Sequence, residues 1–86
     1  MPYIKNEDRD RLDKKINELS DLINSDSRAG ELNYIITKLL LKNTGAGKYQ
    51  DYNELIGMLE CAKQEFYRRH IAPYEDEKII ENGDVE

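Results

Sequence analysis

Apolar side chains recur at helical spacing along three segments of the chain. In the first segment the steps are four, three and four residues, at Leu12, Ile16, Leu19 and Ile23. Such steps place side chains on one face of an α-helix, because that helix turns once in about 3.6 residues. Most other positions are charged, so the opposite face meets water. The pattern predicts a helix over residues 6–24, with Asn6 as its N-cap and turn chemistry at residues 24–27.

A second helix is predicted over residues 30–42. Its apolar stripe is unusually broad, since Tyr34 and Leu41 add apolar surface outside it; the stripe comprises Leu32, Ile35, Ile36, Leu39 and Leu40. A helix that is apolar around more than half its circumference is usually covered on two sides. The polar and glycine-rich residues 43–47 then end this helix and form a loop.

A third helix is predicted over residues 51–71, where Asp51-x-x-Glu54 has the form of a capping box. Its stripe comprises Tyr52, Leu55, Leu59, Ala62 and Phe66. We expect this helix to end by Ile71, because Pro73 disfavours helical backbone at the residue before it. An acidic tail follows over residues 73–86, in which residues 75–81 form one or two helical turns closed by Asn82-Gly83.

These elements predict an all-α fold in one small domain over residues 1–86. The arrangement is either a three-helix antiparallel bundle or a helical hairpin with a short C-terminal helical tail. The stripes hold about fifteen sizeable apolar side chains, a core that barely offsets an ordering entropy of about 1.5 kcal/mol per residue. A single cysteine, Cys61, excludes an internal disulfide. We therefore expect a homo-oligomer, a dimer or larger, in which the second helix is a contact surface.

The charge of the chain is acidic and is concentrated at one end. Of 86 residues, 13 are basic and 18 acidic, which gives a net charge of −5. Residues 71–86 hold Lys78 against six acidic side chains, so this tail accounts for the whole surplus. A general nucleic-acid binder or a binder of anionic membranes is therefore not expected. The longest apolar run is three leucines and cysteine is scarce, so we expect a cytoplasmic protein without a membrane span.

Residues with catalytic or metal-binding chemistry are sparse. The sequence Gly45-Ala46-Gly47-Lys48 lacks the spacing of a phosphate-binding loop. His70 has no second ligand for zinc, and we expect it to cap the end of the third helix. Cys61 is expected to be a small buried side chain. Acidic pairs of the kind that bind magnesium fall only on the first helix, so we expect no catalytic residues, no metal ion and no cofactor.

Two groups of side chains are candidates for binding. Tyr67, Arg68, Arg69 and Tyr74 supply ring faces, hydroxyls and guanidinium groups that suit a planar or anionic ligand. The alternative is that Arg68 and Arg69 pair with the acidic tail and hold it against the helices. The second group is a polar strip on the second helix, formed by Asn33, Tyr34 and Thr37. These residues either specify the register of an interface or line a pocket.

Residues 31–37, residues 52–61 and the closing run of the chain resemble an uncharacterised family of short bacteriophage and bacterial proteins. The closing run is the most specific part and reads Glu-Phe-Tyr-Arg-Arg from residue 65, Ala-Pro-Tyr-Glu-Asp from residue 72 and Asn-Gly-Asp-Val from residue 82. The family has no catalytic residues to transfer. The resemblance implies a phage or mobile-element context, where small binding proteins include inhibitors of host defence.

We therefore expect a small acidic helical binding protein that associates with itself and recognises a small anionic ligand, such as a nucleotide, or a host protein. Two alternatives stay open. One is a metal-dependent nucleoside-phosphate hydrolase of all-α type, and the other is a purely structural interaction module.

Overall fold

The computed structural model describes residues 4–86, and all regular secondary structure in that part of the chain is helical. This confirms the predicted all-α class. Residues 1–3, which the predicted domain includes, lie outside the described residues. The elements are, in order, α1 (Asn6–Leu22), the 3₁₀ turn η1 (Ser25–Ser27), α2 (Arg28–Leu41), α3 (Tyr49–Phe66), the π-helical turn η2 (Tyr67–Ile71) and α4 (Ala72–Asn82).

The corner between α1 and α2 is built from local polar contacts. α1 ends at Leu22, two residues before the predicted boundary, and Lys5 rather than Asn6 is its N-cap. The side chain of Asn24 then accepts a hydrogen bond from the backbone N–H of Asp26 at 3.0 Å, which starts η1. Because η1 supplies the change in direction, α2 begins at Arg28, two residues earlier than predicted.

The loop between α2 and α3 depends on two glycines and one carboxylate. Gly45 and Gly47 have φ angles of 61° and 74°, a region that residues with a Cβ rarely adopt. The carboxylate of Asp51 accepts a hydrogen bond from the backbone N–H of Lys48 at 3.1 Å. Asp51 therefore acts at the third helical position instead of as the N-cap, and α3 begins at Tyr49, two residues before the predicted start.

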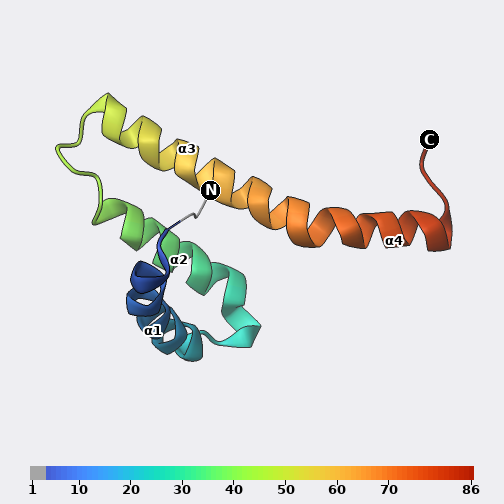
Figure 1. The fold of residues 1–86 in the computed structure, drawn as a ribbon, viewed down its shortest axis with the longest axis horizontal. Coiled ribbons are helices and arrows are strands. Elements are labelled where there is room, and N and C mark those ends of the chain that lie inside the picture. Colours follow the sequence, from blue (N-terminus) through green and yellow to red (C-terminus); the bar gives the residue numbers. More distant parts are fainter. Residues whose placement is uncertain (1–3) are drawn as a thin grey trace.

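α3, η2 and α4 follow one another as a single helical rod, the yellow-to-red part of the chain in Figure 1. The prediction that the third helix ends by Ile71 is therefore wrong, since Ala72 has helical angles of −59° and −47°. Pro73 lacks an N–H, and in an α-helix its ring would clash with the carbonyl four residues earlier. The wider π turn directly before it relieves that clash. Gly83, with a φ of 86°, ends α4 at the predicted Asn82-Gly83 pair.

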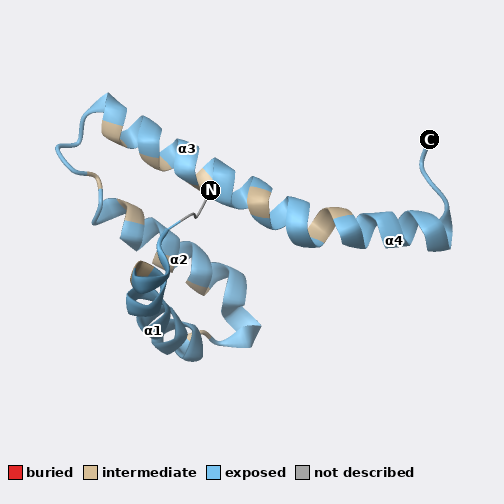
Figure 2. Cartoon of the chain, in the orientation of Figure 1, coloured by how far each residue is buried: buried red, intermediate tan, exposed pale blue. Residues whose placement is uncertain are grey.

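The helices of one chain do not enclose a core. No residue among 4–86 is buried, and Figure 2 shows almost the whole ribbon in the colour of exposed residues. The radius of gyration is 16.7 Å, whereas a compact chain of this length has about 12 Å. The rod projects beyond α1 and α2, and the chain measures 50 × 32 × 29 Å. The apolar stripes are therefore at most half-buried within the described chain.

Candidate functional site

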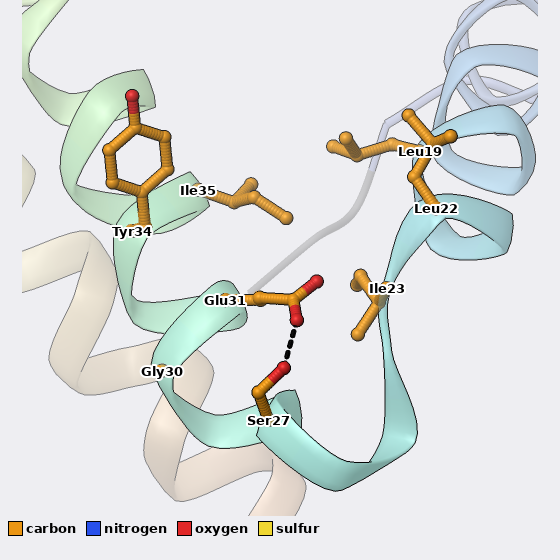
Figure 3. Close-up of a pocket in the computed structure, with 8 residues that line it drawn as sticks. All are labelled: Leu19, Leu22, Ile23, Ser27, Gly30, Glu31, Tyr34 and Ile35. Carbon is orange, nitrogen blue, oxygen red and sulfur yellow. Dashed lines mark hydrogen bonds between the residues drawn. The ribbon is translucent and has the colours of Figure 1, made fainter.

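A pocket of about 310 Å³ lies between the end of α1 and the first half of α2 (Figure 3). Its walls are mostly aliphatic, and the side chains of Glu31 and Ser27 supply its polar atoms. The lining residues are Leu19, Leu22, Ile23, Ser27, Gly30, Glu31, Tyr34 and Ile35. A volume near the lower end of the range for small-molecule sites, about 300–1,000 Å³, also suits one or two large apolar side chains of another protein.

Glu31 is the polar anchor of this pocket. Its carboxylate accepts hydrogen bonds from the hydroxyl of Ser27 and from the backbone N–H of Asn24, the latter at 3.0 Å. These bonds, chiefly the one from Ser27, hold the pKa of Glu31 below its ordinary value of 4.5. Glu31 is therefore an anion at neutral pH and ties the end of α1 to α2.

Sequence reasoning missed this role of Glu31. Ser27 is the N-cap of α2, and a capping box would place the acidic residue three positions later, at Gly30. Glu31 lies one position further along, and it bonds the side chain of the N-cap instead of its backbone. The available signal in the sequence was a serine, Ser27, followed four residues later by Glu31, near the predicted start of the second helix.

The predicted polar strip of α2 is paired within the helix. The hydroxyl of Thr37 donates to the side-chain oxygen of Asn33 at 3.3 Å, one helical turn away. The ammonium group of Lys38 lies 5.7 Å from the centre of the Tyr34 ring, a cation–π distance. Of the three predicted residues, only Tyr34 lines the pocket.

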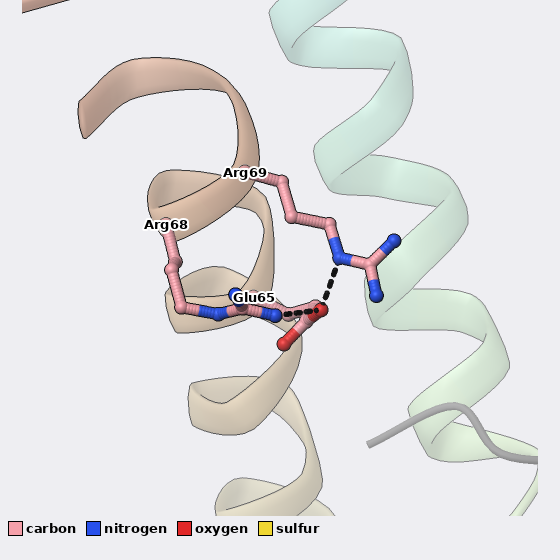
Figure 4. A network of polar contacts seen from close by, with 3 residues as sticks. All are labelled: Glu65, Arg68 and Arg69. Atoms are coloured by element: carbon pink, nitrogen blue, oxygen red, sulfur yellow. Dashed lines mark hydrogen bonds and ion pairs between the residues drawn. The ribbon is translucent and has the colours of Figure 1, made fainter. Parts of the chain in front are cut away.

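Arg68 and Arg69 converge on one carboxylate of their own helix (Figure 4). Arg68 Nη2 lies 2.8 Å from Glu65 Oε1, and Arg69 Nε contacts the same oxygen. These contacts, first that from Arg69, lower the pKa of Glu65 below 4.5. The two arginine side chains are 65% and 57% exposed. Two cations thus share one anion, which leaves one positive charge uncompensated at the surface.

Within one chain Tyr67, and not Arg68, contacts an acidic side chain of the predicted tail. Within one chain the partner of Arg68 is Glu65, and the pairing of Arg68 with the tail of another copy stays a prediction. The hydroxyl of Tyr67 donates to the carboxylate of Glu75. This hydrogen bond raises the pKa of Tyr67 above 10.0, because it favours the neutral phenol and the carboxylate repels the phenolate.

The remaining predicted residue of the rod, Tyr74, also has a partner close by in the chain. Lys78 Nζ lies 5.5 Å from the centre of the Tyr74 ring. The side chains of Arg68 and Arg69 are exposed, and so are Tyr67 and Tyr74. One chain therefore presents these four side chains along a helix surface, and does not enclose them.

Two smaller predictions on the rod are wrong. His70 does not cap a helix end, because the helical rod continues past it to Asn82. Its ring instead lies 5.0 Å from that of Phe66, centre to centre. Cys61 is exposed instead of buried, because no part of residues 4–86 covers it.

Residues 4–86 hold neither a metal-binding cluster nor a membrane-spanning helix. That part of the chain has no group of three or more His, Cys, Asp or Glu side chains close enough to hold a metal ion. None of its helices combines the length and the apolar character that crossing a membrane requires.

A prominent feature of the surface is its large apolar side chains. Each helix exposes large hydrophobic side chains, among them Ile16 and Leu22 on α1, Leu39 and Leu41 on α2, Tyr49, Ile56 and Phe66 on α3, and Tyr74 and Ile80 on α4. Exposed large hydrophobic side chains on every helix, with no residue buried among 4–86, favour an interaction surface. The fold and the site together define a small all-helical protein with large apolar side chains exposed along each helix.

The chain belongs to the family described as "Domain of unknown function (DUF6899)", which matches residues 1–85. This match covers nearly the whole chain and confirms that it is a member of an uncharacterised family. No curated protein and no solved structure shows a significant match to the sequence.

Proposed function

We propose that this protein is a homo-oligomeric interaction protein whose hydrophobic core forms only when chains associate. The observation that carries the proposal is the absence of any buried residue among 4–86, on a chain whose helices all expose large apolar side chains. Hydrophobic burial is the main favourable term in folding. Without hydrophobic burial, a single chain has too little favourable free energy to offset the entropy lost when its backbone is ordered, so the missing burial has to come from a partner.

The exposed area supports a second copy as that partner. One chain exposes 7922 Å², whereas a compact monomer of 10.1 kDa exposes about 5,300 Å². The difference is about 2,600 Å² per chain, or about 5,200 Å² for two chains. Obligate homodimers bury about 2,000–5,000 Å² or more in total, so mutual coverage by copies of the chain accounts for the excess.

The test of self-association is the mass of the purified protein in solution. Light scattering coupled to size exclusion, and native mass spectrometry, should give an integral multiple of 10.1 kDa that is at least two. The far-ultraviolet circular dichroism of the same sample should be strongly helical. A helical, cooperatively unfolding species with the mass of one chain would contradict the proposal.

A second part of the proposal concerns recognition. Arg68 and Arg69 are exposed and share the single carboxylate of Glu65, and this supports recognition of a compact anionic group by their guanidinium groups. In the phage or mobile-element context that the resemblance implies, the anion would belong to a nucleotide or to an acidic surface of a host protein. Binding would compete with Glu65 for the two arginines.

Titration with inorganic pyrophosphate and with a panel of nucleotides tests this recognition. The proposal expects a rise in melting temperature that Arg69→Ala abolishes and that Arg9→Ala, a matched change on exposed α1, leaves intact. If no compound shifts the melting temperature of a stable oligomer, the recognition part is wrong. The protein is then a purely structural interaction module.

A further inference from the structure

We propose that a second copy of this chain docks along the rod in an antiparallel orientation. The contact surface is the rod stripe, defined as Leu55, Leu59, Phe66, Ile71 and Tyr74. The inference rests on the proposed self-association and adds its surface and its direction. Three observations carry it: the register of the π turn, the length of the rod and the distribution of charge.

The π turn keeps the rod stripe on one side of the helix. Phe66 lies seven positions after Leu59, which is about two turns of an α-helix. In an unbroken α-helix the next positions on that side would be Arg69 or His70 and then Pro73. A π turn inserts about one residue into the helical repeat, so the positions become His70 or Ile71 and then Tyr74. The insertion replaces a polar continuation by an apolar one.

The contact between Tyr67 and Glu75 shows this shift independently. In a regular α-helix two residues eight positions apart point about 80° away from each other. If one residue between them is an insertion, the two residues are related as if they were seven positions apart, and their directions around the helix axis differ by only about 20°. Their side chains are in hydrogen-bond contact across the turn. Ile71 is also half-buried, in line with its place on the same side as the half-buried Leu55 and Leu59.

The rod is long enough to pair over its whole length. The 34 residues from Tyr49 to Asn82 rise about 51 Å at about 1.5 Å per residue, which agrees with the 50 Å extent of the molecule. In a fully overlapped antiparallel pair, α4 of one copy lies beside the start of α3 of the other.

The distribution of charge selects this direction. Residues 71–86 carry one basic and six acidic side chains, a net charge of −5, whereas residues 38–50 carry three lysines and no acidic side chain. In a parallel pair the two acidic ends would lie side by side and repel each other. In an antiparallel pair α4 lies beside Asp51 and Glu54 of the other copy, and the acidic residues after α4 reach Lys48 at the α2–α3 corner. This direction brings fewer like charges together than the parallel one, and charge of this kind helps to fix the orientation of partners.

Cysteine crosslinking of the full chain tests the direction. In a Cys61→Ala background, Glu54→Cys and Glu77→Cys are placed at equal distances from the two ends of the rod. Within one chain these positions are about 34 Å apart, too far for a short bismaleimide linker. When the two single-cysteine proteins are mixed, with one carrying a mass tag, the antiparallel pair should give mainly the 54–77 product. A mixture of Glu18→Cys and Glu77→Cys, with Glu18 on α1, is the control and should give little product.

Each outcome separates the two proposals. Predominant 54–54 and 77–77 products in a dimer would overturn the antiparallel direction and leave self-association intact. An oligomer by mass that gives no crosslink with either rod variant would overturn the rod as the interface. A monomeric mass without crosslinks would overturn both proposals.

Discussion

Glu31 determines how the corner between α1 and α2 responds to pH. Its pKa is lowered by the hydrogen bonds from Ser27 and Asn24, so the ionised carboxylate stabilises the folded state above the ordinary value of 4.5. This contribution is lost as the pH falls through the lowered pKa. We expect Glu31→Gln to reduce the free energy of unfolding at neutral pH, and the difference from wild type to vanish as the pH falls well below 4.5.

Urea unfolding at a fixed protein concentration, repeated from neutral to acidic pH, measures this difference. Glu54→Gln removes another exposed carboxylate from a helix and is the matched control, which should show a smaller effect at neutral pH. A deficit of Glu31→Gln that persists unchanged in acid would contradict the assigned hydrogen bonds.

Two glycines allow opposite predictions from the same substitution. Gly57 lies in the interior of α3 with open space where a Cβ would be, so Gly57→Ala should stabilise the protein by about 0.5–1 kcal/mol. Gly45 has a φ of 61° beside the carboxylate of Asp51, so Gly45→Ala should destabilise it by about 1–2 kcal/mol. Thermal unfolding of both variants against wild type gives the two signs. A loss of stability in Gly57→Ala would mean that a second copy covers this side of α3.

At the scale of the elements, the π turn has a measurable consequence for Tyr67. Its pKa is raised above 10.0 by the hydrogen bond to Glu75, and that bond exists only in the shifted register. The stabilisation is fully present below 10.0 and is lost as the pH rises through the raised pKa. Glu75→Gln should return the pKa of Tyr67 towards 10.0, whereas Glu77→Gln should leave it raised. Residue-resolved NMR titration of the tyrosine rings measures both, and an unchanged pKa in Glu75→Gln would exclude this contact in solution.

The sequence predicted the helices well, because apolar spacing reports helices directly. It failed at Pro73, since the rule for the residue before proline assumes α geometry, whereas the chain inserts a π turn that accommodates the ring. Within one chain Arg68 and Arg69 pair with Glu65, whereas their pairing with the acidic tail of another copy stays a prediction. Glu65 lies three and four residues away on the same helix, always within reach, whereas the tail would have had to fold back. Of the pocket, only Tyr34 was foreseen, because the aliphatic walls were assigned to a core that one chain does not form.

At the scale of the whole molecule, folding and association should be a single event. No residue in the described part of the chain is buried. The proposed self-association would supply the missing hydrophobic burial, so the melting temperature should rise with protein concentration. Leu59, half-buried in the rod stripe, would become part of the shared core, where Leu→Ala changes cost about 2–5 kcal/mol. Ile80 is 84% exposed and lies outside the rod stripe, so Ile80→Ala should change stability by no more than about 0.5 kcal/mol.

Chemical unfolding of both variants over a hundredfold range of protein concentration measures the free energy of unfolding and its dependence on concentration together. Leu59→Ala should lower the free energy of unfolding by about 2 kcal/mol or more and shift the dissociation to higher concentration, because the lost contacts lie between chains. Ile80→Ala should follow the wild-type curve at every concentration. The contrary result is unfolding that does not depend on protein concentration, with the same small loss of stability in both variants. Leu59 would then be uncovered in solution and the chain would fold alone, so a shared core would have no physical basis.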